Sequence, residues 1–237
     1  MTTYRIFVAT SPEDLARQCA QQIAAQIDLA LAERDRAQIA LAGGETPKAA
    51  YRRLAEEHLP WERVDVLLGD ERWVSRDDPS SNARMLGETL LASEPGSRAS
   101  FHPVPTDLAD PEASATAYAE LLKTLCAGDP PRFDLILLGL GDDGHTASLF
   151  PGTAAPLVND RAVTIGEGKG LPRITLTAPV LSAARQVMFL VSGAGKQQAL
   201  RRLLDPLEPA ERTPARLVQP AGEVLILADQ AATEGLA

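Results

Sequence analysis

Short runs of apolar residues alternate along this chain with longer segments in which apolar residues recur every three or four positions. The short runs predict strands at residues 5–9, 38–42, 64–68, 134–138, 162–165, 186–191 and 223–227. Several of them, such as the Leu-Ile-Leu-Leu run at 135–138, are apolar on both faces. Strands of this kind are typical of parallel sheets that helices cover on both sides.

The longer segments predict helices between these strands. The first begins after Ser11, a good capping residue, with Pro12 in its first turn. Its apolar stripe is Leu15, Cys19, Ile23 and Ile27. Further helices are predicted at residues 47–57, 82–91, 111–125 and 196–204. The alternation predicts an α/β fold of the Rossmann-like type, with one doubly wound, mostly parallel sheet and helices on both faces. We expect residues 1–237 to form a single domain.

Composition excludes several classes of protein. Hydrophobic residues make up 45% of the 237 residues and charged residues 23%, as in globular proteins. No apolar run approaches the ~18 residues of a membrane span, and the N-terminus does not read as a signal peptide. Cys19 and Cys126 have no metal or redox spacing, so buried thiols are expected. These features predict a cytoplasmic protein with no membrane partner.

The formal net charge is -9, and the largest basic clusters are the pairs Arg52-Arg53 and Arg201-Arg202. Nucleic-acid-binding proteins normally carry a basic stripe, so a nucleic-acid partner is not expected. An acidic protein that binds an anion needs a local site with a few well-aimed donors.

In an open α/β sheet, ligands bind beyond the carboxyl ends of the strands. Four loops that follow predicted strands hold most of the reactive side chains: residues 43–46, 69–72, 139–145 and 192–196. We therefore expect these four loops to meet in one site.

The first loop predicts an anion site. Gly43 and Gly44 allow close approach to the backbone, and the helix that follows offers free N–H groups. Thr46 is expected to cap this helix and to add a hydroxyl group. A tight strand-to-helix turn without a ligand is the alternative.

Residues 139–144 match the dinucleotide motif G-x-G-x-x-G, but Asp142 and Asp143 would repel a pyrophosphate. Pro151 and Gly152 also interrupt the helix that this motif requires. In the fourth loop, Lys196 follows a Gly-rich turn whose spacing does not fit an ATP-binding P-loop. It suits a single phosphate as a point charge, or it is a solvated surface lysine.

His145 follows two carboxylates at the end of a hydrophobic strand, which suits a general base; a purely structural histidine is the alternative. Asp70 could orient a substrate hydroxyl and Arg72 could bind an anion or oxyanion, unless the two pair within their loop. No zinc motif and no G-x-S-x-G serine motif is present, so neither a metal nor a serine nucleophile is expected.

Five segments together resemble the glucosamine-6-phosphate isomerase/6-phosphogluconolactonase family, and the likeness spans nearly the whole chain. They are LAGGETP at 41–47, GDERWV at 69–74, GLGDDGHTASLFPG at 139–152, RITLTAPVL at 173–181 and SGAGK at 192–196. The third is the most specific. The resemblance implies a doubly wound fold with no cofactor and no metal.

The resemblance also implies roles. Within the family, the five segments best resemble the enzymes that hydrolyse 6-phospho-D-glucono-1,5-lactone, a small phosphosugar lactone. His145 would activate the water, with Asp143 rather than Asp142 beside it. Arg72 and the N–H groups near Gly43 and Gly44 would stabilise the oxyanion. The residues that would hold the 6-phosphate are Lys196, Arg173 and Thr46.

Two other classes remain as alternatives: a glucosamine-6-phosphate deaminase or isomerase, and a non-catalytic sugar-phosphate sensor. In the deaminases a glutamate follows the Asp-Gly-His unit, and here Phe150 stands at that place. A sensor would need a DNA-binding module, for which the chain has no spare length. Arg216 stands where the family usually has a small or polar residue. The sequence leaves open whether the chain is a monomer or a weak homo-oligomer.

Overall fold

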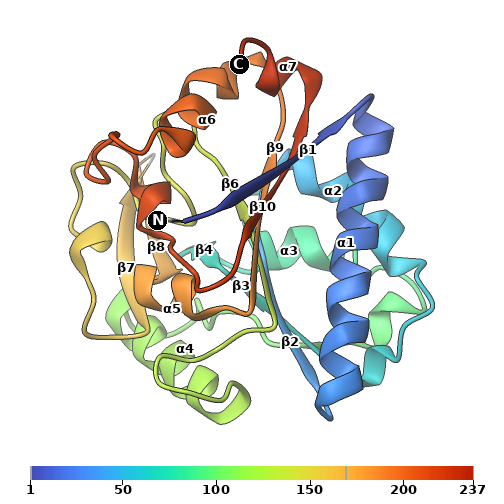
Figure 1. Ribbon diagram of the computed structural model, residues 1–237. Coiled ribbons are helices and arrows are strands. Elements are labelled where there is room, and N and C mark those ends of the chain that lie inside the picture. Colours follow the sequence, from blue (N-terminus) through green and yellow to red (C-terminus); the bar gives the residue numbers. More distant parts are fainter. Residues whose placement is uncertain (1, 169, 237) are drawn as a thin grey trace.

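The computed structural model describes residues 2–168 and 170–236, and its centre is a sheet of parallel strands (Figure 1). The seven strands lie in the order β1 (Tyr4–Ala9), β10 (Val224–Asp229), β9 (Gln186–Val191), β6 (Leu135–Gly139), β2 (Ala37–Leu41), β3 (Val64–Leu68) and β5 (Ser100–Phe101). Every pair of neighbours is parallel. The predicted doubly wound α/β fold is confirmed.

Helices cover both faces of this sheet (Figure 1). On one face α1 (Pro12–Glu33) packs against α2 (Glu45–Ala55), and α3 (Asn82–Gly87) follows beside them. On the other face lie α4 (Pro111–Leu125) and α5 (Ala178–Ala183), while α6 (Gln197–Leu204) and α7 (Gln230–Thr233) lie near the C-terminus. No helix in the described part of the chain is both long and apolar enough to cross a membrane.

The first helix forms for the reasons that its sequence predicts. The Ser11 side chain accepts a hydrogen bond from the Asp14 N–H, and Pro12 occupies the first turn. The predicted stripe from Leu15 to Ile27 is buried against the sheet.

Two helices differ from the prediction by two or more residues at an end. α2 begins at Glu45 with Gly44 as its capping residue, so Thr46 lies in the first turn and does not cap the helix. α3 ends at Gly87 rather than at residue 91. There the Thr89 hydroxyl donates to the Met85 carbonyl, which satisfies an acceptor at the helix end.

A second, antiparallel sheet was not predicted. It contains β4 (Asp70–Arg72), β8 (Leu171–Leu176) and β7 (Val163–Gly168), in that order. The strand predicted at 162–165 therefore lies here and not in the parallel sheet. β4 is three charged residues and β8 contains Pro172 and Arg173, so neither has the apolar pattern that marks a buried strand.

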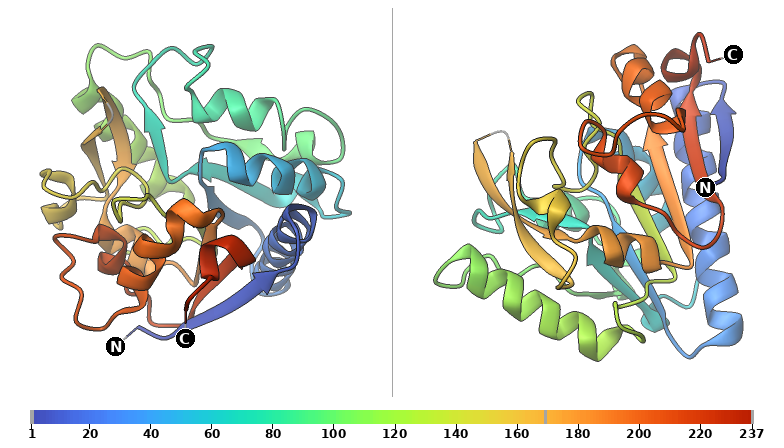
Figure 2. Two further views of the ribbon diagram at one scale, coloured as in Figure 1. Left: turned by 90° about the horizontal axis from the view of Figure 1, so that it is seen from above. Right: turned by 60° about the vertical axis from the view of Figure 1, so that its left-hand side comes forward.

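The strand order reverses between β2 and β6. From β2 the chain continues outward through β3 and β5, and it then returns to β6 on the other side of β2. Ligand sites of doubly wound proteins lie at this crevice. Figure 2 (left) looks down on the carboxyl edge, where the loops after the strands gather.

Candidate active site

A cavity of about 260 Å³ lies at the crevice. Its walls come from the loops after β2, β3, β6 and β9 and from β8. Eight of the nine predicted site residues line it: Gly43, Gly44, Thr46, Asp70, Arg72, His145, Arg173 and Lys196. The structure therefore brings the four predicted loops together.

The ninth residue, Asp143, contacts His145. The Nδ1 atom of His145 lies 2.5 Å from Asp143 Oδ1, which also accepts from the His145 backbone N–H at 3.0 Å. Burial opposes ionisation of Asp143, but these bonds from His145 outweigh it and lower the pKa of the carboxyl group. An ionised carboxylate on Nδ1 fixes the orientation of the ring and makes Nε2 the nitrogen for proton transfer.

One glycine of the G-x-G-x-x-G segment, Gly141, makes room for this histidine. A Cβ atom at Gly141 would lie 2.0 Å from His145 Nδ1 and 2.7 Å from Asp143 Oδ1. Gly144 has φ +93° and lies against Thr213. The motif is thus a tight turn that packs an imidazole onto bare backbone, and this explains its chance likeness to a dinucleotide-binding loop.

The neighbouring Asp142 has a different partner, Lys196. The Lys196 ammonium group forms an ion pair with the Asp142 carboxylate at the edge of the cavity. Lys196 ends a single 3-10 turn, Ala194–Lys196, which follows Gly193 at φ +95°. Asp229 fixes this loop by accepting from the Ser192 hydroxyl at 2.6 Å and from the Gly193 N–H.

Asp70 and Arg173 form a buried pair on the facing wall. Asp70 Oδ2 accepts from the Ser148 hydroxyl at 2.5 Å and lies 3.6 Å from Arg173 Nη1. Burial of Arg173 lowers the pKa of its guanidinium group, although Asp70 partly compensates. The position of Asp70 therefore depends on the small antiparallel sheet, because Arg173 belongs to β8.

The Phe150 ring lies close to both His145 and Arg173. Its ring centroid is 4.2 Å from that of His145, and the Arg173 guanidinium carbon lies 5.3 Å from the same centroid. Gly168 leaves room for this ring, since a Cβ atom there would lie 2.2 Å from it. An apolar ring thus stands beside the histidine where the deaminases have a glutamate.

The start of α2 is open to the cavity. Gly44 has φ +110°, and no side chain caps the first turn. Free N–H groups at a helix start attract anions. Gly43 has a different reason to be glycine: a Cβ atom there would lie 1.8 Å from Asn82 Oδ1. The space beside Gly43 belongs to a side chain, contrary to the expectation that both glycines admit a ligand.

Arg72 is held from the side of α3. Its Nη1 donates to the Ser80 carbonyl and, at 2.9 Å, to Asn82 Oδ1. Glu71 organises the same loop by accepting from the N–H groups of Asn82 and Ala83 at 2.8 and 2.7 Å. Arg72 therefore bonds to the Ser80 carbonyl and to Asn82 rather than to Asp70, so the structure does not support the alternative of a pair within the loop.

Sequence reasoning missed Asn82, Ser148 and Ser192, which all contact predicted site residues. Ser148 and Ser192 lie within the segments 139–152 and 192–196, but neither was given a role there, and Asn82 lies outside all five segments. Each is a small polar residue whose role depends on partners far away in the chain. Arg216 lies apart from them: it donates to the carbonyl groups of Leu203 and Pro206, at the end of α6.

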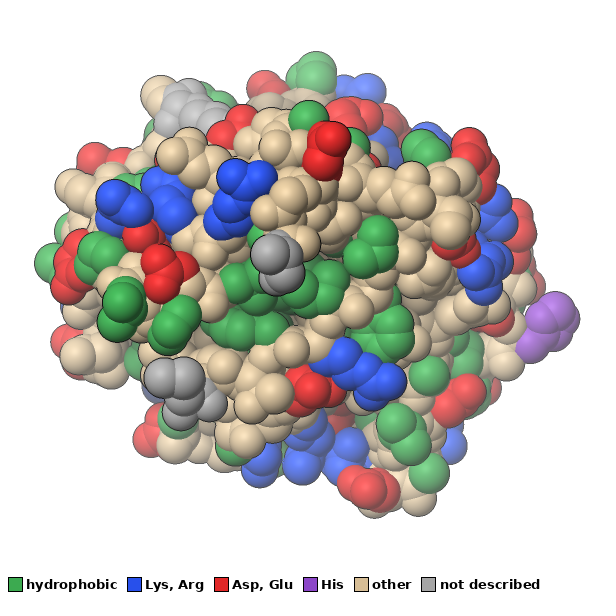
Figure 3. Space-filling view, turned by 45° about the horizontal axis from the view of Figure 1, so that its top comes forward, with side chains coloured by type: hydrophobic (Ala, Val, Ile, Leu, Met, Phe, Trp, Pro, Cys, Tyr) green, Lys and Arg blue, Asp and Glu red, His purple; other side chains and the backbone are tan. Residues whose placement is uncertain are grey.

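Three cationic side chains, Arg72, Arg173 and Lys196, line the cavity together with the start of α2 and the carboxylates of Glu45 and Asp70. Among residues 2–168 and 170–236, no three His, Cys, Asp or Glu side chains lie close enough together to hold a metal ion. On the face shown in Figure 3, basic and acidic side chains are interspersed rather than gathered in one basic stripe. Fold and site define an α/β protein with a preformed cavity suited to a small anion.

The family follows from comparison with known proteins. The model of the family described as glucosamine-6-phosphate isomerases/6-phosphogluconolactonase matches residues 10–227, and the chain belongs to this family. The resemblance inferred from the sequence is confirmed.

Individual relatives agree. A 6-phosphogluconolactonase of Synechocystis sp. is 50% identical over 217 residues, which cover 90% of each chain. One of Nostoc sp. is 43% identical over 213 residues, or 89% of each chain. The solved structure of a 6-phosphogluconolactonase from Trypanosoma brucei superposes with a TM-score of 0.88 at 32% identity, covering 100% of this chain and 99% of that one.

Proposed function

We propose that this chain hydrolyses 6-phospho-D-glucono-1,5-lactone to 6-phospho-D-gluconate, a step of the oxidative pentose phosphate pathway. Its relatives place it among the carboxylic ester hydrolases of the 6-phosphogluconolactonase type. The observation that carries the proposed mechanism is the His145–Asp143 pair on the wall of a cavity that also collects three cationic side chains.

In this mechanism His145 is the general base. Asp143 holds Nδ1, and Nε2 takes a proton from a water molecule as the water oxygen attacks the C1 carbonyl carbon. The tetrahedral intermediate then collapses, and the C1–O5 bond of the ring breaks. His145 Nε2 returns its proton to the ring oxygen, which leaves as the C5 hydroxyl group, and C1 becomes a carboxylic acid that releases a proton to give the carboxylate of the product.

The negative charge that develops on the carbonyl oxygen needs donors that are already in place. Arg72 and the N–H groups after Gly44 are suited to this, since both face the cavity and Arg72 is held by two acceptors on one nitrogen. We assign the 6-phosphate to Lys196, Arg173 and Thr46, which also line the cavity. Asp70, buried between Ser148 and Arg173, would accept a hydrogen bond from a sugar hydroxyl.

Deamination of an amino sugar requires more than this site offers. It needs ring opening, proton transfer between carbons and loss of an amine, and so several acid–base groups around the histidine. Phe150, rather than a glutamate, packs on the His145 ring. Ester hydrolysis needs one base, one water molecule and an oxyanion site.

The test is turnover of freshly generated 6-phosphogluconolactone and of glucosamine 6-phosphate, side by side at neutral pH. Product formation from the lactone is coupled to a dehydrogenase that oxidises 6-phosphogluconate, and spontaneous hydrolysis is subtracted. We expect lactone turnover and no release of ammonia or fructose 6-phosphate. Faster reaction of the amino sugar would refute the proposed function and leave the fold assignment intact.

A further inference from the structure

Asn82 lies where three parts of the cavity wall meet. It is the first residue of α3, only 1% of its surface is exposed, and it lines the cavity. Its side chain reaches both the loop after β2 and strand β4.

The two ends of the Asn82 amide have different partners on β4. Oδ1 accepts from Arg72 Nη1 at 2.9 Å, whereas Nδ2 donates to the Asp70 carbonyl at 2.8 Å. The amide is planar, so the bond to the Asp70 backbone fixes the direction in which Oδ1 faces Arg72. The Asn82 N–H is in turn held by Glu71 at 2.8 Å.

The third neighbour is Gly43. A Cβ atom at Gly43 would lie 1.8 Å from Asn82 Oδ1 and 2.3 Å from its Cγ. Gly43 is not among the glycines with positive φ, so its backbone conformation alone does not demand glycine. The residue that demands it is Asn82.

We propose that Asn82 is a positioning residue that holds the Arg72 guanidinium group in place over the cavity, and that Gly43 is glycine in order to admit Asn82. With the Ser80 carbonyl and Asn82 both on Nη1, the rest of the guanidinium group keeps one orientation toward a ligand. The inference rests on the proposed function for the reaction that the assay follows.

The first experiment is a double-mutant cycle on kcat/KM for 6-phosphogluconolactone. Asn82→Ala removes one charge-assisted hydrogen bond and is expected to lower kcat/KM about 10–100-fold. In the Arg72→Ala background the same change should cost less than about twofold, because its target is gone. If the double variant loses as much kcat/KM as the product of the two single losses, Asn82 acts independently of Arg72, and the proposal is overturned.

A second double-mutant cycle tests whether Gly43 is glycine in order to make room for Asn82. Gly43→Ala should lower kcat/KM in the wild type by pushing the Asn82 amide aside, but should cost little more in the Asn82→Ala background. An equal loss in both backgrounds would mean that the added methyl group acts elsewhere, and would overturn the role given to Gly43.

Thr89→Ala is the matched structural control. Thr89 is buried just beyond the end of α3, where its hydroxyl donates to the Met85 carbonyl. Its loss should lower Tm and leave kcat/KM unchanged at temperatures where the protein is folded. A fall in kcat/KM equal to that of Asn82→Ala would indicate that any loosening of α3 has this effect.

A crystal structure of the Asn82→Ala variant makes the test independent of activity. We expect the Arg72 guanidinium group to leave the Ser80 carbonyl. An unmoved Arg72 would overturn the inference even if the lactonase assay succeeds, whereas a displaced Arg72 in a protein without lactonase activity would uphold it and refute the proposed function.

Discussion

Asp142 and Asp143 are adjacent in the chain and chemically identical, yet their carboxylates serve opposite sides of one turn. Asp143 faces the His145 ring, and Asp142 faces Lys196. Because the turn is closed by the bond from the Gly144 N–H to the Gly141 carbonyl, successive side chains diverge. At the scale of single residues, the path of the backbone through this turn thus decides which carboxylate reaches His145 and which reaches Lys196.

His145→Ala is expected to lower kcat by about 10²–10⁴, the usual contribution of a general base. KM should change little, since the base contacts the attacking water more than the sugar. Steady-state rates after subtraction of spontaneous hydrolysis test this, and turnover equal to the wild type would remove His145 from the mechanism.

Lys196→Ala is expected to raise KM for the phosphorylated lactone by about 10–150-fold, the range for one charge-assisted contact. The ion pair with Asp142 leaves Lys196 at the edge of the cavity, where it can exchange that carboxylate for phosphate. Unphosphorylated gluconolactone, measured in parallel, should be nearly unaffected. Equal losses on both substrates would assign Lys196 a structural role instead.

At the scale of elements, the site depends on turns in which glycine is required for different reasons. Gly141 makes room for His145, Gly43 for Asn82, and Gly44 adopts a positive φ at the start of α2. The parallel sheet fixes where each loop begins, and side chains from other loops then fill the spaces that the glycines leave.

Gly141→Ala tests this directly. The new Cβ atom would collide with His145 Nδ1, so we expect kcat to fall toward the level of His145→Ala although no reacting group is removed. Gly87→Ala is the control, because a Cβ atom there meets nothing within 4 Å. It should leave kcat unchanged; similar losses in the two variants would contradict the steric explanation.

The same comparison shows how far the sequence predicts the molecule. Six of the seven parallel strands were predictable, as were α1 and α4, because each carries an apolar period or a capping residue. The two-residue strand β5 was not, since it lies in a polar stretch. β4, β8 and the partners of Arg72 were not predictable either, because their order arises from contacts across the chain: Arg72 pairs in register with Arg173. Candidate site residues could be collected from strand ends, but the contacts of Asn82 and Ser148 depend on residues distant in the sequence.

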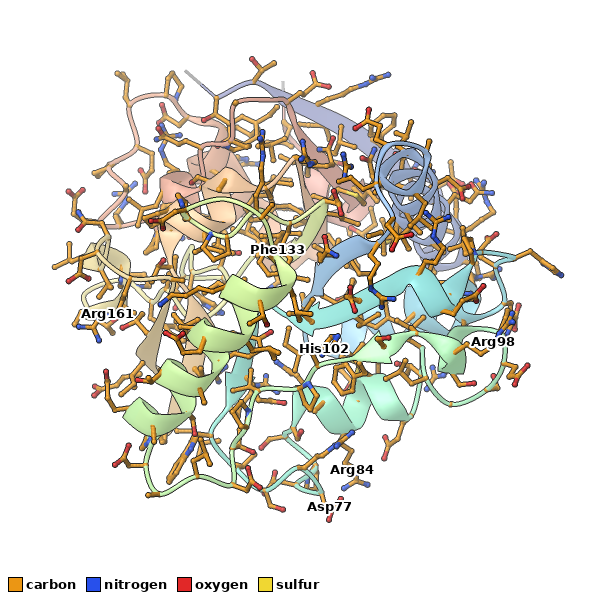
Figure 4. All side chains as sticks on the ribbon, turned by 90° about the horizontal axis from the view of Figure 1, so that it is seen from below. Asp77, Arg84, Arg98, His102, Phe133 and Arg161 are labelled. Carbon is orange, nitrogen blue, oxygen red and sulfur yellow. The ribbon has the colours of Figure 1, made fainter. Side chains whose placement is uncertain are left out.

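At the scale of the whole molecule, the carboxyl and amino ends of the parallel strands have different roles. The cavity lies at the carboxyl ends of the parallel strands, and an ion-pair cluster around Asp65 lies near their amino ends, at the start of β3. Its member His102 is labelled in Figure 4. Asp65 accepts from Arg36 at 2.7 and 2.8 Å, from Gln38 at 3.2 Å and from His102 at 2.9 Å. These partners join β3 to the residues beside β2 and β5.

Asp65→Asn is expected to lower the free energy of unfolding at neutral pH by on the order of 2 kcal/mol, while kcat stays unchanged. Burial opposes ionisation of Asp65, but its bonds to Arg36 and His102 prevail and lower its pKa. Because the pKa of Asp65 is lower in the folded state, its ionised carboxylate stabilises that state above about pH 4, the ordinary range for a carboxyl group. This stabilisation is lost as the pH falls from there through the lowered pKa.

Urea denaturation of both proteins between pH 3 and 7 measures this. The difference in the free energy of unfolding between wild type and Asp65→Asn should be largest at neutral pH and should decrease below about pH 4. A difference independent of pH would show that the carboxylate charge is not what Asp65 contributes.

The pairing of β1 with β10 places the first strand of the sheet next to the last. Tyr4 lies in register with Val224, 220 positions later in the chain. At translation rates of about 5–20 residues per second, the partner of β1 reaches the ribosome exit only roughly 10–40 s after β1 itself. During that interval the Ile6-Phe7-Val8 segment has no partner strand. Both sides of its backbone are then open to pairing with other chains, whereas in the folded protein β10 covers one side and β1 is the edge strand of the sheet.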